Sequence, residues 1–118
     1  MRKNQKAKLS GDALDMVAER FKILSEPMRL RLIYSLMDGE KSVTQLVEET
    51  ESLQANVSKH LGMMLDAGVV GRRKEGLRAY YRVTDESIYE LCDLVCGSIQ
   101  DRLEADLGRF SSAVSPSS

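Results

Sequence analysis

The chain has 118 residues, of which 42% are hydrophobic and 30% are charged, and its net charge at pH 7 is −1. This length allows one domain with a modest core, and the composition is typical of a globular, largely helical protein. No apolar stretch approaches the roughly 18 to 20 residues that span a membrane, and no apolar segment follows the basic start, so we expect neither a membrane partner nor a secretory signal.

A basic leader and an amphipathic helix begin the chain. Residues 1–11 lack apolar periodicity, so we expect a disordered leader there. From residue 12 to about residue 24, apolar side chains recur at helical spacing, which predicts the first helix. Pro27 suits the first turn of a second helix, which we expect to stop at Gly39.

Two helices joined by a short turn are predicted next. Ser42 and Gln45 have the spacing of a capping box, which opens a third helix to about Glu49. After three or four linking residues, a fourth helix is predicted at about residues 53–67, followed by Gly68 as a left-handed C-terminal residue. This is the arrangement of a helix-turn-helix, whose second helix reads DNA.

Beyond the fourth helix the hydrophobic period changes from 3.6 to 2. Residues 69–83 predict a β-hairpin, the wing, which turns at Glu75-Gly76. A long final helix is predicted at about residues 85–107, and residues 109–118 are predicted to form a disordered tail. The sequence therefore predicts a mainly α fold with a small β-hairpin, a winged helix-turn-helix in one domain at residues 12–108.

Charge is distributed unevenly along the chain. Residues 1–52 are balanced, whereas residues 53–82 carry six basic and two acidic side chains, a net charge of +4. Residues 84–107 carry seven acidic side chains and one basic one, a net charge of −6. The fourth helix and the wing would therefore attract a polyanion that the last helix repels.

The fourth helix begins with side chains that can read base edges. Gln and Asn pair with adenine, Ser serves several bases, and Ala can touch a thymine methyl group. Hydroxyls at helix N-termini and the basic wing suit phosphate oxygens. The predicted DNA-binding residues are Ser42, Thr44, Ser52, Gln54, Ala55, Asn56, Ser58, Lys59, His60, Arg72, Arg73, Lys74 and Arg78.

Two parts of this interpretation have plain alternatives. The polar face of the fourth helix could be an ordinary solvated surface beside an ordinary basic hairpin. His60, the only histidine, could donate to a phosphate, or it could be a partly buried residue with a satisfied ring nitrogen.

Four segments together carry a family resemblance. They are the lead into the second helix at residues 24–30, the Val57-Ser58-Lys59-His60-Leu61 core of the fourth helix, residues 66–70, and the Tyr80-Tyr81-Arg82 strand. Over residues 14–107 the chain resembles the ArsR/SmtB family of winged-helix repressors. The resemblance implies a homodimer paired through the first and last helices, a palindromic DNA operator, and release from DNA when an effector binds or oxidises the protein.

Cys92 and Cys96 lie one helical turn apart in the last helix, so their Cβ atoms should be about 5–6 Å apart on one face. A thiophilic species such as As(III) could bridge them with a third ligand from elsewhere. Oxidation or capture of reactive sulfur is a second interpretation, and buried packing is a third. The family's other sensor patterns are absent, because residues 44–49 hold no Cys and the last helix holds no His. We therefore expect no resident cofactor.

These observations favour one function over two others. We predict a sequence-specific DNA-binding repressor. We expect it to be cytoplasmic, because two cysteines without a secretory signal are typical of a reducing compartment. The alternative is a winged-helix module that binds proteins and does not read DNA. We expect no enzyme, because the sequence pairs no histidine with either cysteine and suggests no open metal site.

Overall fold

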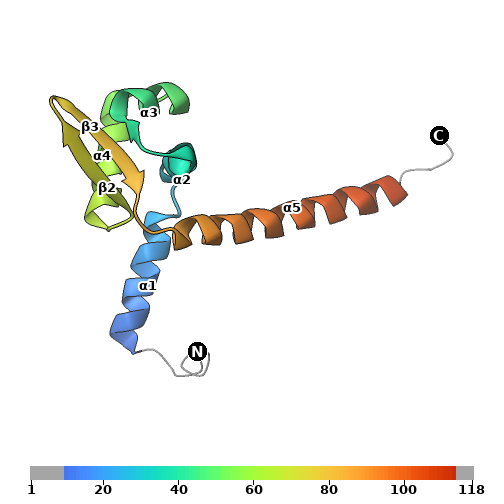
Figure 1. Cartoon of the computed structure of the whole chain (residues 1–118). Coiled ribbons are helices and arrows are strands. Elements are labelled where there is room, and N and C mark those ends of the chain that lie inside the picture. The colour runs from blue at the N-terminus through green and yellow to red at the C-terminus, as the bar shows by residue number, and fades with distance from the viewer. Residues whose placement is uncertain (1–9, 114–118) are drawn as a thin grey trace. The chain divides into compact units, whose positions relative to one another are not determined.

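The computed structural model describes residues 10–113, with side chains as far as residue 109, and the chain divides into two compact units at residues 84 and 85. Figure 1 shows the elements in chain order. The first unit contains α1 (Gly11–Ile23), α2 (Pro27–Ser35), a short 3₁₀ helix η2 (Leu36–Asp38), β1 (Lys41–Ser42), α3 (Val43–Thr50), α4 (Gln54–Asp66), β2 (Val70–Glu75) and β3 (Arg78–Val83); the second contains α5 (Ser87–Ala113). Within the described residues, no helix has the length and apolar content to cross a membrane.

The first two helices begin at side-chain caps. The Ser10 hydroxyl accepts a hydrogen bond from the Ala13 N–H at 3.1 Å, and the Glu26 carboxylate accepts one from the Arg29 N–H at the same distance. Pro27 occupies the first turn of α2, as predicted. Gly39 has a φ of 130°, which a residue with a side chain rarely adopts, so the helical segment ends there as expected.

The helix-turn-helix consists of α3, a three-residue turn and α4. The predicted capping box is confirmed, because the Ser42 hydroxyl accepts from the Gln45 N–H at 3.2 Å and the Gln45 side chain accepts from the Ser42 N–H at 2.8 Å. Glu51 closes α3 in the left-handed region, with a φ of 52°. Leu53 is then the N-cap of α4, so this helix begins one residue later than predicted.

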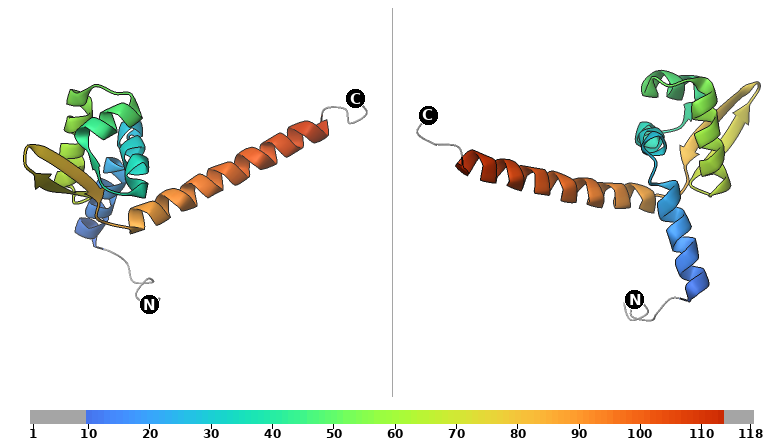
Figure 2. Two further views of the ribbon diagram at one scale, coloured as in Figure 1. Left: turned by 45° about the horizontal axis from the view of Figure 1, so that its top comes forward. Right: turned by 180° about the vertical axis from the view of Figure 1, so that it is seen from behind.

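The wing forms part of a three-stranded antiparallel sheet in the order β1-β3-β2. Glu75 pairs with Arg78, which leaves a two-residue turn whose first residue, Gly76, has a φ of 64°. The hairpin was predicted, but β1 was not, because two residues are too few to show an alternating pattern. Figure 2 shows the hairpin projecting from the helices of this unit.

A small core holds the second, third and fourth helices together with the base of the wing. The fully buried side chains are Leu32, Ile33, Leu46, Val57, Leu61, Met64 and Val69. They come from α2, α3, α4 and the residue before β2, and α4 packs against α2, α3 and β2. This packing fixes one face of α4 and leaves its opposite face at the surface.

The final helix, α5, extends further along the chain than predicted. Asp85 accepts hydrogen bonds from the backbone N–H and the hydroxyl of Ser87, and α5 then continues to Ala113. The prediction of a disordered tail was therefore wrong for residues 109–113. Gly108 costs a helix about 1 kcal/mol relative to Ala but does not end it. Residues 114–118 and 1–9 lie outside the described residues, whereas Ser10 and Gly11, assigned to the leader, are the cap and first residue of α1.

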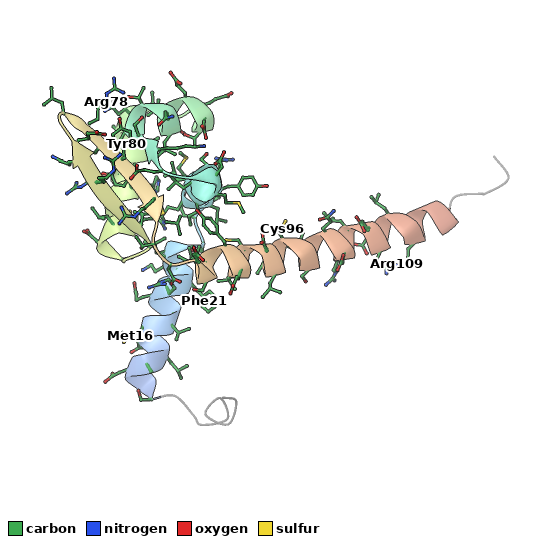
Figure 3. The ribbon with its side chains drawn as sticks, in the orientation of Figure 1. Met16, Phe21, Arg78, Tyr80, Cys96 and Arg109 are labelled. Carbon is green, nitrogen blue, oxygen red and sulfur yellow. The ribbon has the colours of Figure 1, made fainter. Side chains whose placement is uncertain are left out.

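Both terminal helices expose apolar side chains in the single chain. No residue of α1 is buried, and Met16 and Phe21 project from it in Figure 3. On α5 an apolar stripe recurs at helical spacing, and its members Val95, Ile99, Leu103 and Leu107 are each at least half exposed. Amphipathic helices normally bury such stripes against another element or another chain.

Candidate nucleic-acid interface

The exposed face of α4 holds most of the predicted base-reading side chains. Gln54, Ala55, Ser58 and Lys59 are exposed, and Asn56 is half-buried. The opposite face is anchored by the core described above. Because side chains four apart lie on the same side of a helix, Gln54 and Ser58 present hydrogen-bonding groups in one direction. The exposed face of α4 is therefore polar, whereas its opposite face is buried.

The three hydroxyls predicted near phosphates occupy different environments. Thr44 is exposed in the first turn of α3. Ser42 is buried and its hydroxyl serves the capping box, and Ser52 is half-buried with its hydroxyl 3.4 Å from the Met28 sulfur. Ser52 also does not cap α4, which begins without a side-chain cap. Of the three, only Thr44 therefore keeps a hydroxyl at the open surface.

The wing sorts its basic residues onto two faces. Residues paired across the hairpin share a face, so Arg72 lies on the face of the buried Tyr81, and Lys74 lies with Ala79. Both cations extend that face toward the exposed hairpin tip, and neither has an ion-pair partner among residues 10–109. They are therefore available to a polyanion.

Arg73 and Arg78 lie on the other face of the wing. The Arg73 guanidinium donates to Glu40 at 2.8 and 3.0 Å and to Glu75 at 3.2 Å, and it stacks 4.8 Å from the Tyr80 ring centre. These hydrogen bonds raise the pKa of Arg73 and lower that of Glu40. The predicted phosphate contact of Arg73 thus competes with contacts within the protein, whereas Arg78 is exposed near the hairpin tip (Figure 3).

His60 faces the interior and not the surface. Its side chain is 6% exposed, and Nδ1 lies 3.2 Å from an Nη1 atom of Arg29. The prediction that His60 contacts DNA is corrected by this burial, and the alternative of a satisfied, buried ring nitrogen describes what is seen. His60 lies about one helical turn from both Val57 and Met64, so it belongs to the anchored face of α4.

Sequence reasoning missed Arg29, the buried cation of α2. A charged residue is almost never buried without partners, and position 29 adjoins the buried Met28 and Leu32. The sequence signal that could have identified Arg29 as a buried cation is its position on the apolar face of a short helix.

The two cysteines of α5 differ in exposure. Cys92 is half-buried and Cys96 is exposed, and Figure 3 shows Cys96 on the helix surface. Partial burial raises the pKa of the Cys92 thiol, and the neighbouring Asp93 and Cys96 raise it further. Among the described residues, no three Cys, His, Asp or Glu side chains form a group suited to a metal ion. A metal bound by this pair would need a ligand from outside it.

Comparison with known proteins places these elements in context. Residues 26–71, from the N-cap of α2 to the second residue of β2, match the family model described as bacterial regulatory protein, arsR family. The chain is 32% identical over 83 residues to the HTH-type transcriptional regulator KmtR of Mycobacterium tuberculosis, covering 70% of this chain and 64% of KmtR. It is 34% identical over 77 residues to the probable mercury resistance operon repressor of Streptomyces lividans, covering 65% and 62%.

The fold has close counterparts among solved structures. The solution structure of the homodimeric winged helix-turn-helix DNA-binding domain Mb0332 from Mycobacterium bovis, described as a possible ArsR-family regulator, matches with a TM-score of 0.73 and 31% identity, covering 84% of this chain and 94% of that one. The predicted winged helix-turn-helix fold is thereby confirmed. The chain spans less than two thirds of KmtR and of the mercury repressor.

Proposed function

This chain belongs to the ArsR family of bacterial regulatory proteins, and we propose that it is a cytoplasmic, dimeric repressor that binds a palindromic operator in double-stranded DNA. The proposal is carried by two observations together, the exposed polar face of α4 and the unpaired, exposed cations Arg72 and Lys74 on the wing. Since the family consists of transcriptional regulators, we propose no catalytic activity.

The dimer explains two surfaces that the single chain leaves uncovered. The apolar side chains on α1 and α5 suit burial against a second copy, as the resemblance implies. In two-fold helix-turn-helix dimers, the recognition helices enter successive major grooves about 34–36 Å apart. The homodimeric state of Mb0332 supports this assignment.

Binding to the DNA upstream of the chain's own gene tests the proposal. We expect fluorescence anisotropy to show tighter binding to this fragment than to a scrambled fragment of the same length and composition. Affinity for both should fall as salt rises, because phosphate contacts release counterions. Equal affinity for the two fragments would contradict sequence reading. No binding at low salt would favour the protein-binding module instead.

We further propose that Cys92 and Cys96 receive the effector, with As(III) or another thiophilic ion as the first candidate. The repressor from Streptomyces lividans is named for mercury resistance, which supports a soft metal. The exposure of Cys96 also weighs against the interpretation that the pair serves only as packing in the core of the single chain. Reactive sulfur species and oxidants are the other candidates.

A double substitution separates these candidates. We expect Cys92→Ser with Cys96→Ser to keep operator affinity within about threefold, since none of the predicted DNA-binding residues lies on α5. We expect the same variant to abolish release by arsenite, which in the wild type should correspond to the coupling of about 1–3 kcal/mol that is typical between two linked sites. The measurement is operator-bound fraction against arsenite, and separately against polysulfide. Release of the double variant at wild-type concentrations would show that these thiols are not the sensor.

A further inference from the structure

Arg29 joins the end of α1 to the recognition helix, α4. Its side chain is 7% exposed. Nε donates to the Ile23 carbonyl oxygen at 2.6 Å, and an Nη2 donor lies 3.5 Å from the Lys22 carbonyl oxygen, so the guanidinium binds the last carbonyls of α1. Nη1 contacts His60 Nδ1 at 3.2 Å and the Met63 sulfur at 3.5 Å, both on α4.

This arrangement defines the protonation state of His60. A guanidinium can only donate, so His60 Nδ1 must accept, and the ring is neutral with its proton on Nε2. Nε2 in turn lies 3.9 Å from Glu26 Oε1, at the N-cap of α2. The contact between α2 and α4 therefore depends on an unprotonated ring.

We propose that Arg29 and His60 are positioning residues that hold α4 at the orientation in which its polar face enters DNA. The inference rests on the proposed function. Because α1 is one of the two helices expected to pair in the dimer, a hydrogen-bonded connection from its last turn to α4 fixes the recognition helix relative to the dimer axis. The two copies of α4 must match the spacing of successive major grooves. Loosening the connection through Arg29 and His60 should therefore weaken operator binding without unfolding the chain.

The positioning role has a pH dependence of definite sign. Protonation of His60 removes the acceptor and puts a second positive charge beside Arg29. The charged groups that face His60 are Glu26, Arg29 and Lys59; burial lowers the pKa of His60, Glu26 opposes this, and the two cations add to it. The neutral ring is thus retained to below pH 6.5 in the folded chain, and both stability and DNA affinity fall as pH decreases further. A histidine that bound phosphate would give the opposite sign, since its protonation strengthens binding to a polyanion.

The experiment compares three chains by operator affinity at pH 7.5 and pH 5.0, with circular dichroism to confirm folding at each pH. His60→Asn keeps an acceptor near the position of Nδ1 and cannot be protonated in this range. His60→Leu has no acceptor. We expect wild-type affinity to fall more than threefold at pH 5.0 and His60→Asn to stay within threefold of its own value at pH 7.5. We expect His60→Leu to bind at least tenfold more weakly than the wild type at pH 7.5.

The outcomes separate this inference from the proposed function. If the wild type binds its operator at pH 7.5 and the folded His60→Leu chain binds equally well, the positioning role is wrong and the repressor assignment stands. Wild-type affinity that rises toward pH 5.0, with a flat His60→Asn profile, would also overturn it. If His60→Leu does not fold, the contrast between the wild-type and His60→Asn pH profiles decides the question. Failure of the wild type to bind at pH 7.5 would overturn both proposals.

Discussion

Leu61→Ala is expected to lower the free energy of unfolding by about 2–5 kcal/mol. Leu61 is fully buried in α4, which packs against α2, α3 and β2. Truncation loses the favourable transfer free energy of the removed apolar groups and leaves a cavity. The surrounding elements α2, α3 and β2 are packed against α4, so they can close the cavity only in part. Urea denaturation followed by circular dichroism measures the change, at one fixed protein concentration because dimerisation contributes to apparent stability.

Leu53→Ala is the matched control for this prediction. Leu53 is the N-cap of the same helix, is 79% exposed, and makes no side-chain capping bond. The same chemical change should therefore alter the free energy of unfolding by no more than about 0.5 kcal/mol. Similar effects at the two positions would show that α4 is not anchored by the face described above.

Arg72→Ala with Lys74→Ala is expected to reduce operator affinity strongly, because it removes the two unpaired cations on one face of the wing. If each contacts one phosphate, the slope of log affinity against log salt should become shallower by about 0.9 for each contact, or about 3.6 for a dimer with both wings bound. Affinity at low salt should fall by at least about 100-fold. A salt titration of fluorescence anisotropy gives both numbers.

Two further chains show whether the wing acts through position and not through net charge alone. Arg31→Ala with Arg109→Ala removes the same charge at two positions of α2 and α5 that are not among the predicted DNA-binding residues, and should change the salt slope by less than one. Gln54→Ala should leave the slope unchanged while reducing the preference for the operator over scrambled DNA, since one base contact contributes about 1–3 kcal/mol of discrimination. An equal loss of slope in the Arg31/Arg109 chain would contradict a specific wing contact.

Elements with strong local signals were predicted from the sequence to within a few residues. Pro27, the Ser42 capping box and the turn at Gly76 each specify backbone geometry through neighbours close in sequence. The two-residue strand β1 and the continuation of α5 to Ala113 lacked such a signal. Strand β1 depends on pairing with Tyr81 and Tyr80, about forty residues away in sequence. In α5, Gly108 is compatible with both a helix interior and a helix end.

The candidate interface was predicted by residue type but not by exposure. Helical periodicity correctly separated Gln54 and Ser58 from the buried Val57. It could not show that His60 turns toward Arg29, or that Arg73 is held by Glu40, because both partners lie about thirty residues away in sequence. Such contacts are decided by tertiary packing, which also determined that Ser42 serves the fold instead of the surface.

The spacing and stoichiometry of the protein on DNA test the central claim most directly. We expect two chains per operator, measured by analytical ultracentrifugation with labelled DNA, and hydroxyl-radical protection in two patches centred about one helical turn, or 34–36 Å, apart. A single protected patch with one bound chain, or protection without a repeat along the helix, would contradict a dimer that places two copies of α4 in successive major grooves.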